Sequence, residues 1–443
     1  MSKYIHQRVF PLLALCLLLA ACSPASGIGA GTTPTPSTHS PGSTPGASTD
    51  PQADTCPGQL RGDPGCFTPH AMRVAYGIEP LVQKGFTGKG QTVVDVVSFG
   101  SPTLQRDIDV FDRQFNLPQI KLQIIAPLHV PEYDPRGDKS GWVGETTLDV
   151  EMIHAIAPDA NIVVLVSPVA ETEGTVGLPE FRQLEQYALD HHLGNIVSQS
   201  WGASEVTLQD QAGQQELQKW DAFYQQSTTQ QGITYLTASG DNGATDYADL
   251  QGKNLSKSAT TSFAADNPWV TSVGGTTLTR SGATFSEKVW NSGGASGGGF
   301  SRFFKTPSYQ QTLPASVQSQ LNNRRGVPDI AAAADPSTAL AYYVSGQWQL
   351  IGGTSASTPL CAGIIAIAEQ MAGHPLGFIN PGLYKLAKSS TYNQDFRDIT
   401  AGNNSNYAAG VTGYSAAPGW DAATGLGSPN AEKLIPDLIA AMK

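Results

Sequence analysis

Segments with the hydrophobic pattern of strands alternate with segments of helical periodicity along most of this chain. The strand-like runs are residues 91–98, 161–166, 195–200 and 233–238. Runs of this kind that lack a regular polar alternation indicate parallel strands that are covered on both faces. Between them, residues 146–157 and 178–189 carry apolar side chains at helical spacing. The alternation predicts an α/β fold with a largely parallel central sheet and helices on both of its faces.

The N-terminus has the pattern of an export signal. Lys3 and Arg8 precede an apolar run, residues 9–21, that is too short to span a bilayer. The run ends in Leu-Ala-Ala-Cys, which resembles the lipobox of bacterial lipoproteins, so we expect cleavage before Cys22 and a lipid anchor on this cysteine. An ordinary secretory signal followed by a chance cysteine is the alternative. Either signal predicts an extracellular protein, at the cell envelope or secreted.

The chain then divides into three parts. Residues 1–21 are the predicted signal peptide. Residues 22–55 are dominated by Ser, Thr, Pro, Gly and Ala, which cannot bury enough apolar surface to fold, and they predict a disordered tether. Residues 56–443 are predicted to form a single domain, and we expect it to be a monomer.

Composition and cysteines fit export. Charged residues make up 14% of the chain, and the net charge of −11 argues against nucleic-acid binding. Cys56 and Cys66 bracket a segment with Gly and Pro, so a local disulfide is expected in an oxidising compartment. Cys361 lies in an apolar helical stretch, which favours a small buried core residue.

A candidate nucleophile lies in residues 352–359, which read Gly-Gly-Thr-Ser-Ala-Ser-Thr-Pro before an Ala/Ile-rich helix. At a helix N-terminus, free N–H groups and the helix dipole can stabilise an oxyanion beside Ser355. The same residues also form ordinary helix caps, in which Ser355 or Ser357 is only the N-cap. A nucleophilic serine needs a base, and no histidine of this chain lies in a motif suited to that role.

Carboxylates are the alternative base. Glu145 and Asp149 are four residues apart after a Gly-rich loop, so they project from one face of the predicted helix. Close carboxyl groups share a proton, although acidic residues also simply complement a helix N-terminus. Asp241 follows the strand at 233–238, where α/β sheets carry their sites. An aspartate in Ser-Gly-Asp-Asn-Gly also commonly caps its own turn.

Together these motifs resemble the sedolisin family, serine-carboxyl peptidases with a subtilisin-like fold. The resemblance runs from Phe67 to the C-terminus and includes Ser-Trp-Gly at 200–202, Gly-Gly-Gly-Phe-Ser at 297–301 and Arg-Gly-Val-Pro-Asp-Ile at 325–330. Subtilisin itself needs a histidine and an oxyanion asparagine, whereas this chain has Asp241 at the oxyanion position.

The resemblance implies an acid-active endopeptidase whose substrates are proteins or peptides. Ser355 would be the nucleophile, Glu145 its general base and Asp149 the residue that orients the base, while a protonated Asp241 would donate a hydrogen bond to the oxyanion. Ser200, Trp201 and Gly202 would bind an extended substrate by strand addition. A tripeptidyl exopeptidase, or a catalytically silent peptide-binding lipoprotein, are the alternatives.

The resemblance also implies one calcium ion. Its ligands would be the carboxylates of Asp398 and Asp421 with the carbonyl groups of Ile399, Ala417 and Gly419, a set of oxygen ligands that suits Ca²⁺. A Gly-rich surface loop with solvated aspartates is the alternative. The chain departs from the family in one respect, because residues 22–55 cannot form the folded propeptide that the family typically carries before its catalytic domain.

Overall fold

The computed structural model describes residues 54–130, 137–171 and 173–443. The predicted signal peptide, Cys22 and nearly all of the predicted tether therefore lie outside the described residues. The described residues form one compact unit.

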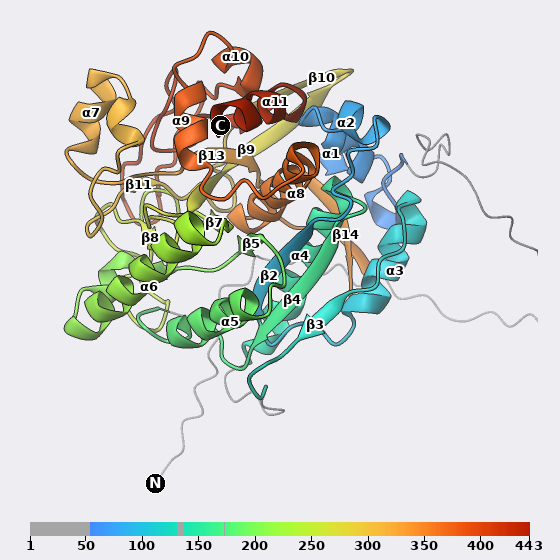
Figure 1. Ribbon diagram of the computed structural model, residues 1–443, viewed down its shortest axis with the longest axis horizontal. Helices are drawn as coiled ribbons and strands as arrows, with labels where there is room; N and C mark the ends of the chain where they lie inside the picture. Colours follow the sequence, from blue (N-terminus) through green and yellow to red (C-terminus); the bar gives the residue numbers. More distant parts are fainter. Residues whose placement is uncertain (1–53, 131–136, 172) are drawn as a thin grey trace, which may run out of the picture. The chain divides into compact units, whose positions relative to one another are not determined.

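A central eight-stranded sheet organises the described chain (Figure 1). Its order is β10-β9-β7-β5-β2-β4-β3, and β13 pairs with β9. The pairs are parallel, apart from the antiparallel pair of β9 and β10. The strands are β2 (Thr92–Ser98), β3 (Gln123–Ile125), β4 (Asn161–Ser167), β5 (Ile196–Gln199), β7 (Thr234–Ala238), β9 (Thr271–Ser281), β10 (Thr284–Val289) and β13 (Ile330–Ala333). The four predicted strands are all present, and the α/β prediction is confirmed.

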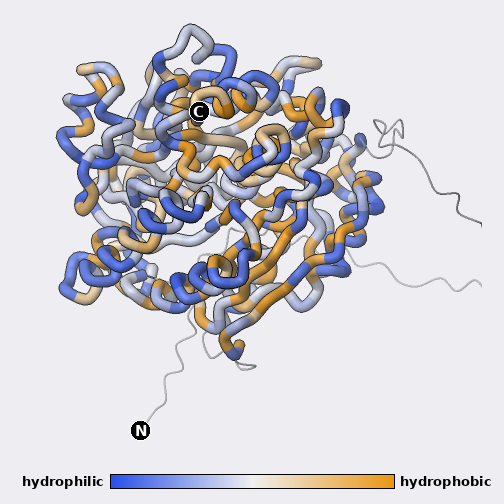
Figure 2. The backbone as a smooth tube through the Cα atoms, viewed as in Figure 1, coloured by the Kyte–Doolittle hydropathy of each residue, from blue (hydrophilic) through white to orange (hydrophobic). Residues whose placement is uncertain are grey.

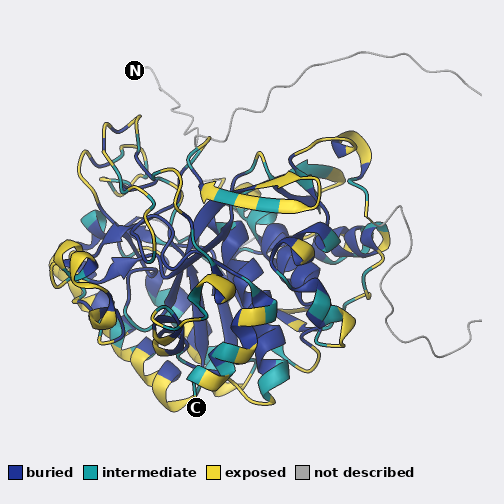
Figure 3. Ribbon diagram, turned by 90° about the horizontal axis from the view of Figure 1, so that it is seen from above, coloured by how far each residue is buried: buried dark blue, intermediate teal, exposed yellow. Residues whose placement is uncertain are grey.

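Helices cover both faces of this sheet. On β2, Val93 and Val97 point into the core shared with α4 and α8, while Val94 and Val96 point into the core shared with α5 and α6. Figure 2 shows the hydrophobic central strands, and Figure 3 shows them buried inside a more exposed outer layer. The main helices are α3 (Leu104–Phe115), α4 (Lys139–Ile156), α5 (Leu178–Asp190), α6 (Gln211–Gln230), α8 (Thr354–Ala372) and α11 (Ala431–Ala441).

Short elements complete the fold. The remaining helices are α1 (Pro69–Ala75), α2 (Glu79–Gln83), α7 (Ala315–Leu321), α9 (Asn380–Leu386) and α10 (Tyr392–Asp395). The remaining strands are β1 (Cys66–Phe67), β6 (Ala203–Ser204), β8 (Ser262–Phe263), β11 (Gly299–Phe300), β12 (Gly326–Val327), β14 (Ala339–Val344), β15 (Gln347–Leu350), β16 (Phe396–Arg397) and β17 (Ser428–Pro429). The 3-10 helices are η1 (Gly58–Leu60), η2 (Glu205–Leu208) and η3 (Gln310–Thr312).

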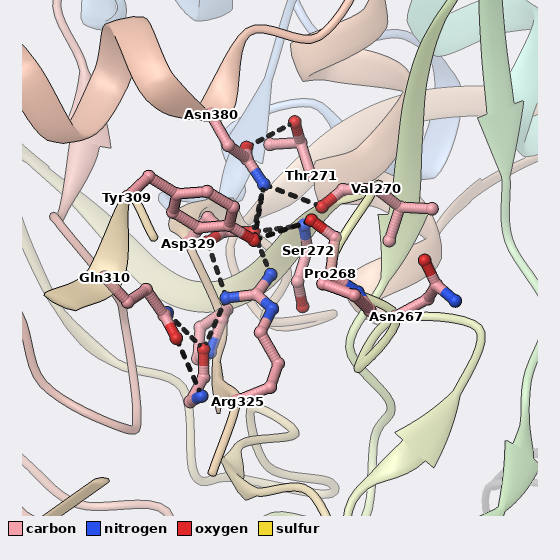
Figure 4. A network of polar contacts seen from close by, with 12 residues as sticks. Asn267, Pro268, Val270, Thr271, Ser272, Tyr309, Gln310, Arg325, Asp329 and Asn380 are labelled. Carbon is pink, nitrogen blue, oxygen red and sulfur yellow. Dashed lines mark hydrogen bonds and ion pairs between the residues drawn. The ribbon is translucent and has the colours of Figure 1, made fainter. Parts of the chain in front are cut away.

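A buried ion pair joins the segment before β13 to its surroundings (Figure 4). Arg325 and Asp329 are both completely buried, and the guanidinium binds both carboxylate oxygens. Tyr384 donates to Asp329 at 2.7 Å, and the backbone N–H of Ser272 donates to it at 2.8 Å. The pair thereby ties β9 and α9 to the loop between β12 and β13.

The cysteines behave as small structural groups. Cys56 and Cys66 form a disulfide that closes the first turn of the described chain, with a Cα–Cα distance of 6.3 Å. Cys361 is buried in α8, and burial raises the pKa of its thiol. No helix within the described ranges is both long enough and apolar enough to span a bilayer.

Candidate active site

Helix α4 carries the predicted carboxylate pair. The sequence predicted that this helix starts after a Gly-rich loop, directly before Glu145. In the structure the helix begins at Lys139, and Gly141 and Gly144 lie inside its first turns. Glu145 and Asp149 therefore lie in the body of the helix, one turn apart, and complementing a helix N-terminus no longer accounts for them. Asp149 is completely buried, whereas Glu145 is partly exposed.

Ser355 lies in the first turn of α8, opposite Glu145. The side chains of Glu145 and Ser355 are hydrogen-bonded. Loss of solvation raises the pKa of Glu145 to about 7, the serine hydroxyl opposes this rise, and the charge of Asp241 adds to it. The helix cap is Gly353, so Ser355 is not the N-cap residue.

Asp241 approaches the same helix end from the loop after β7. Its Oδ1 accepts hydrogen bonds from the N–H of Thr354 at 2.7 Å and from the hydroxyl of Thr354 at 2.8 Å. Gly353 has a φ of +110°, and a Cβ there would lie 2.6 Å from Asp241 Oδ2, so a glycine is needed for this approach. Burial among protein atoms raises the pKa of Asp241, and the charge of Asp246 adds to it, although the residue stays open to solvent on one side.

A fourth carboxylate, which the sequence analysis did not single out, lies next to the Glu145–Asp149 pair. Asp95 is in the middle of β2, completely buried, and its carboxyl group is in hydrogen-bond contact with that of Asp149. Its strand neighbours Val93, Val94, Val96 and Val97 are all buried valines. An aspartate inside such a run was a usable signal, because burying a carboxylate is costly and therefore often marks a functional site.

The Ser200-Trp201-Gly202 segment has two separate roles. The hydroxyl of Ser200 donates to Asp149 Oδ1 at 2.8 Å, which joins this residue to the carboxylate group. The indole of Trp201 is packed between Phe181 and Trp220 and is only 4% exposed. The side chain of Trp201 therefore does not line a binding surface, and any substrate contact at this position is limited to the backbone.

His154 is a histidine of helix α4. It is completely buried on α4, and its Nε2 lies 3.0 Å from Asp112 Oδ1 and 3.0 Å from the carbonyl oxygen of Pro118. Its imidazole is therefore a packed core group, bound to partners other than Ser355.

The predicted calcium ligands come from two neighbouring loops. Gly419 N–H donates to Asp398 Oδ2 at 3.0 Å, and Ala417 N–H donates to Asp421 Oδ2 at 3.1 Å. Asp398 Oδ1 is buried without a hydrogen-bond donor. Burial raises the pKa of Asp421 to about 6. No cluster of three or more His, Cys, Asp or Glu side chains within the described chain could hold a metal ion. A cation here would therefore depend on these two carboxylates and on carbonyl groups such as that of Ile399.

Comparisons with known proteins identify the family of this chain. The subtilase family model matches residues 140–380, a segment that contains Glu145, Asp149, Asp241 and Ser355. The chain belongs to the subtilase family. Within it, the relatives are sedolisins: kumamolisin of Bacillus sp. (strain MN-32) is 33% identical over an alignment of 386 residues that covers 85% of this chain and 64% of kumamolisin. Sedolisin of Pseudomonas sp. (strain 101) is 33% identical over an alignment of 356 residues that covers 77% of this chain and 57% of sedolisin.

A solved structure agrees with this sedolisin assignment. Pseudomonas sedolisin, a serine-carboxyl proteinase complexed with two molecules of pseudo-iodotyrostatin, superimposes with a TM-score of 0.70 at 28% identity. The match covers 83% of this chain and 96% of that one. Tripeptidyl-peptidase 1 of Rattus norvegicus is 30% identical over an alignment of 312 residues that covers 67% of this chain and 52% of that protein. The fold is therefore subtilisin-like, as predicted, and this sedolisin-family chain spans less than two thirds of the curated relatives named here.

Proposed function

We propose that this sedolisin-family chain is an acid-active serine-carboxyl endopeptidase that hydrolyses peptide bonds of proteins. The observation that carries the proposal is the hydrogen bond between Glu145 and Ser355, with the carboxyl group of Asp241 at the same helix end. The site thus holds a nucleophile, an acceptor for its proton and a donor for the oxyanion.

The reaction follows from these contacts. Glu145 takes the proton of Ser355 Oγ as Oγ bonds to the substrate carbonyl carbon, and the carbonyl oxygen becomes an oxyanion. Asp241 donates through Oδ2, because Thr354 already occupies Oδ1. Glu145 then returns the proton to the amide nitrogen as the C–N bond breaks, and water releases the acyl group from Ser355 by the same steps in reverse order. Asp149, held by Ser200, orients Glu145.

The pH dependence of cleavage tests the proposal. The productive form has Glu145 ionised and Asp241 protonated, so cleavage of a denatured protein is expected to rise and then fall with pH, with its maximum below pH 7. Because Asp241 loses its proton as pH rises through its raised pKa, Asp241→Asn is expected to remove the fall at high pH. The amide of asparagine donates at every pH.

The assay also separates the candidate functions. Internal fragments in mass spectra would identify an endopeptidase, whereas sequential release of tripeptides would favour the second candidate, a tripeptidyl-peptidase. The similarity to tripeptidyl-peptidase 1 is the observation in favour of that candidate. No cleavage between pH 3 and pH 8 would contradict both and favour a silent peptide-binding protein.

We also propose one calcium ion between the loops of Asp398 and Asp421. A cation at Asp398 Oδ1 would satisfy a buried oxygen that has no donor, and its charge would offset the burial that raises the pKa of Asp421. In this site Ca²⁺ would hold the two loops together and take no part in catalysis.

Chelation tests this ion. A ligand that binds only the folded state raises its stability, so EGTA is expected to lower the Tm and added Ca²⁺ to restore it. Asp398→Asn is expected to have a lower Tm than the parent protein and to lose its response to EGTA. The exposed Asp190→Asn serves as the matched control and should respond like the parent. An unchanged Tm on chelation, or a full response in Asp398→Asn, would count against the site.

Export and a lipid anchor on Cys22 complete the proposal. The disulfide of Cys56 and Cys66 supports an oxidising compartment. Radiolabelled palmitate is expected to label the parent protein in a bacterial host and to leave Cys22→Ala unlabelled. Label in both proteins, or in neither, would contradict the anchor.

A further inference from the structure

The carboxyl group of Asp95 is buried with almost no hydrogen-bond partners. Neither of its oxygens receives an N–H or O–H from another residue in the described chain, and Asp149 Oδ2 is likewise buried without a donor. The polar group in contact with Asp95 is the carboxyl group of Asp149. Two touching carboxylates cannot both stay ionised away from water, so a proton must lie between them.

Among the described residues, the surroundings of Asp95 supply no cation to replace that proton. Glu145 and Asp149 are the ionisable groups of α4 that act on Asp95. The flanking strands β4 and β5 contain no ionisable side chain, and the residue in register on β5 is Ser198, whose buried hydroxyl has no partner. Helix α8 contributes Cys361 and Glu369, and Glu369 instead accepts from the N–H of Leu376, beyond the C-terminal end of the helix.

We propose that Asp95 is a positioning residue of the active site, which shares a proton with Asp149 and thereby fixes the face that Asp149 presents to Glu145. Asp149 is then held on two sides, by the hydroxyl of Ser200 and by the carboxyl group of Asp95. The carboxyl groups titrate as one coupled group, formed by Asp95, Asp149 and Glu145. The rise of activity with pH at the acid end of the profile therefore depends on the protonation of all three. This inference rests on the proposed peptidase function.

Loss of the Asp95 charge is expected to shift the pH profile of activity in one direction. Burial raises the pKa of Asp149, and the charge of Asp95 raises it further. Removing that charge lowers the pKa values of the remaining pair, so the low-pH limb of kcat is expected to move to lower pH in Asp95→Asn. The asparagine amide can still donate to Asp149, so kcat at the optimum should stay within a few-fold of the parent.

The apolar variant Asp95→Leu separates positioning from packing. This variant removes both the charge of Asp95 and its hydrogen bond to Asp149. Loss of a residue that orients a catalytic residue through a hydrogen bond typically lowers activity by about 10- to 100-fold. We expect a loss of this size in kcat, with KM within about twofold of the parent. The Tm should stay close to that of the parent, because leucine removes the cost of burying the Asp95 carboxyl group, and this gain offsets the lost hydrogen bond to Asp149.

The experiment measures kcat, KM and Tm from pH 3 to pH 8 for the parent, Asp95→Asn and Asp95→Leu. Glu151→Gln is the matched control, since Glu151 is another buried carboxyl group of α4 that faces Asp107 and Asp112 instead of the site. Glu151→Gln should leave kcat and the low-pH limb unchanged. An unmoved low-pH limb in Asp95→Asn together with full kcat in Asp95→Leu would overturn the proposal.

A spectroscopic measurement makes the result independent of peptidase activity. The infrared carbonyl band of a protonated, buried carboxylic acid should be present in the parent and in Ser355→Ala, and it should be lost or shifted in Asp95→Asn. Identical bands in the parent and Asp95→Asn would contradict the shared proton even if the protein is an active peptidase. A lost band in a protein that cleaves nothing would support the shared proton and contradict only the proposed function.

Discussion

Ser355→Ala is expected to lower kcat by about a millionfold, the loss typical of removing the nucleophile of a hydrolase that uses a nucleophile and base as a unit. Glu145→Gln keeps the size of the side chain but cannot accept the proton of Ser355, so a loss of about 10²- to 10⁴-fold is expected. The two losses should not add in the double variant, because either change already disables the same proton transfer.

Steady-state cleavage of a synthetic peptide at the pH optimum measures both losses. Glu185→Gln is the matched control for the glutamate, since this carboxyl group is buried on the opposite face of the sheet and binds Gln199. Thermal melts should show that Ser355→Ala is folded, because Ser355 is a partly exposed residue. Undiminished cleavage by Ser355→Ala would rule out the serine mechanism.

Asp329→Asn is expected to give the largest loss of stability. It removes the charge that pairs with Arg325, and a buried guanidinium left without its partner costs about 3–5 kcal/mol. The free energy of unfolding measured by urea denaturation should fall by this amount. The double variant Arg325→Met/Asp329→Leu should be less destabilised than Asp329→Asn, because it leaves no unpaired buried charge.

An exposed ion pair provides the comparison. Lys84 and Glu432 are 3.6 Å apart with side chains that are 59% and 34% exposed. Glu432→Gln is expected to change the free energy of unfolding by no more than about 1 kcal/mol, the usual size for a pair in water. An equal effect at Glu432 and Asp329 would mean that burial is not what gives the Arg325–Asp329 pair its importance.

Our sequence analysis predicted the parts of the fold that depend on local pattern. The strands β2, β4, β5 and β7 and the helices α4 and α5 were predicted because their hydrophobic periodicity is a property of neighbouring residues. The start of α4 was wrong, since glycines at 141 and 144 indicated a loop, and tertiary packing overrides their low helix propensity.

The sequence by itself determined which chemical groups the chain offers and how those close in sequence are arranged. Glu145 and Asp149 share a helix face because of their four-residue spacing, and Ser355 lies at a helix start because of its motif. Only the tertiary structure decided which distant groups meet. Ser200 reaches Asp149 across 51 residues, Thr354 binds one oxygen of Asp241 across 113, and Asp95 reaches Asp149 through the packing of α4 on β2. These contacts depend on strand register and layer packing, which bring together residues that no local pattern relates.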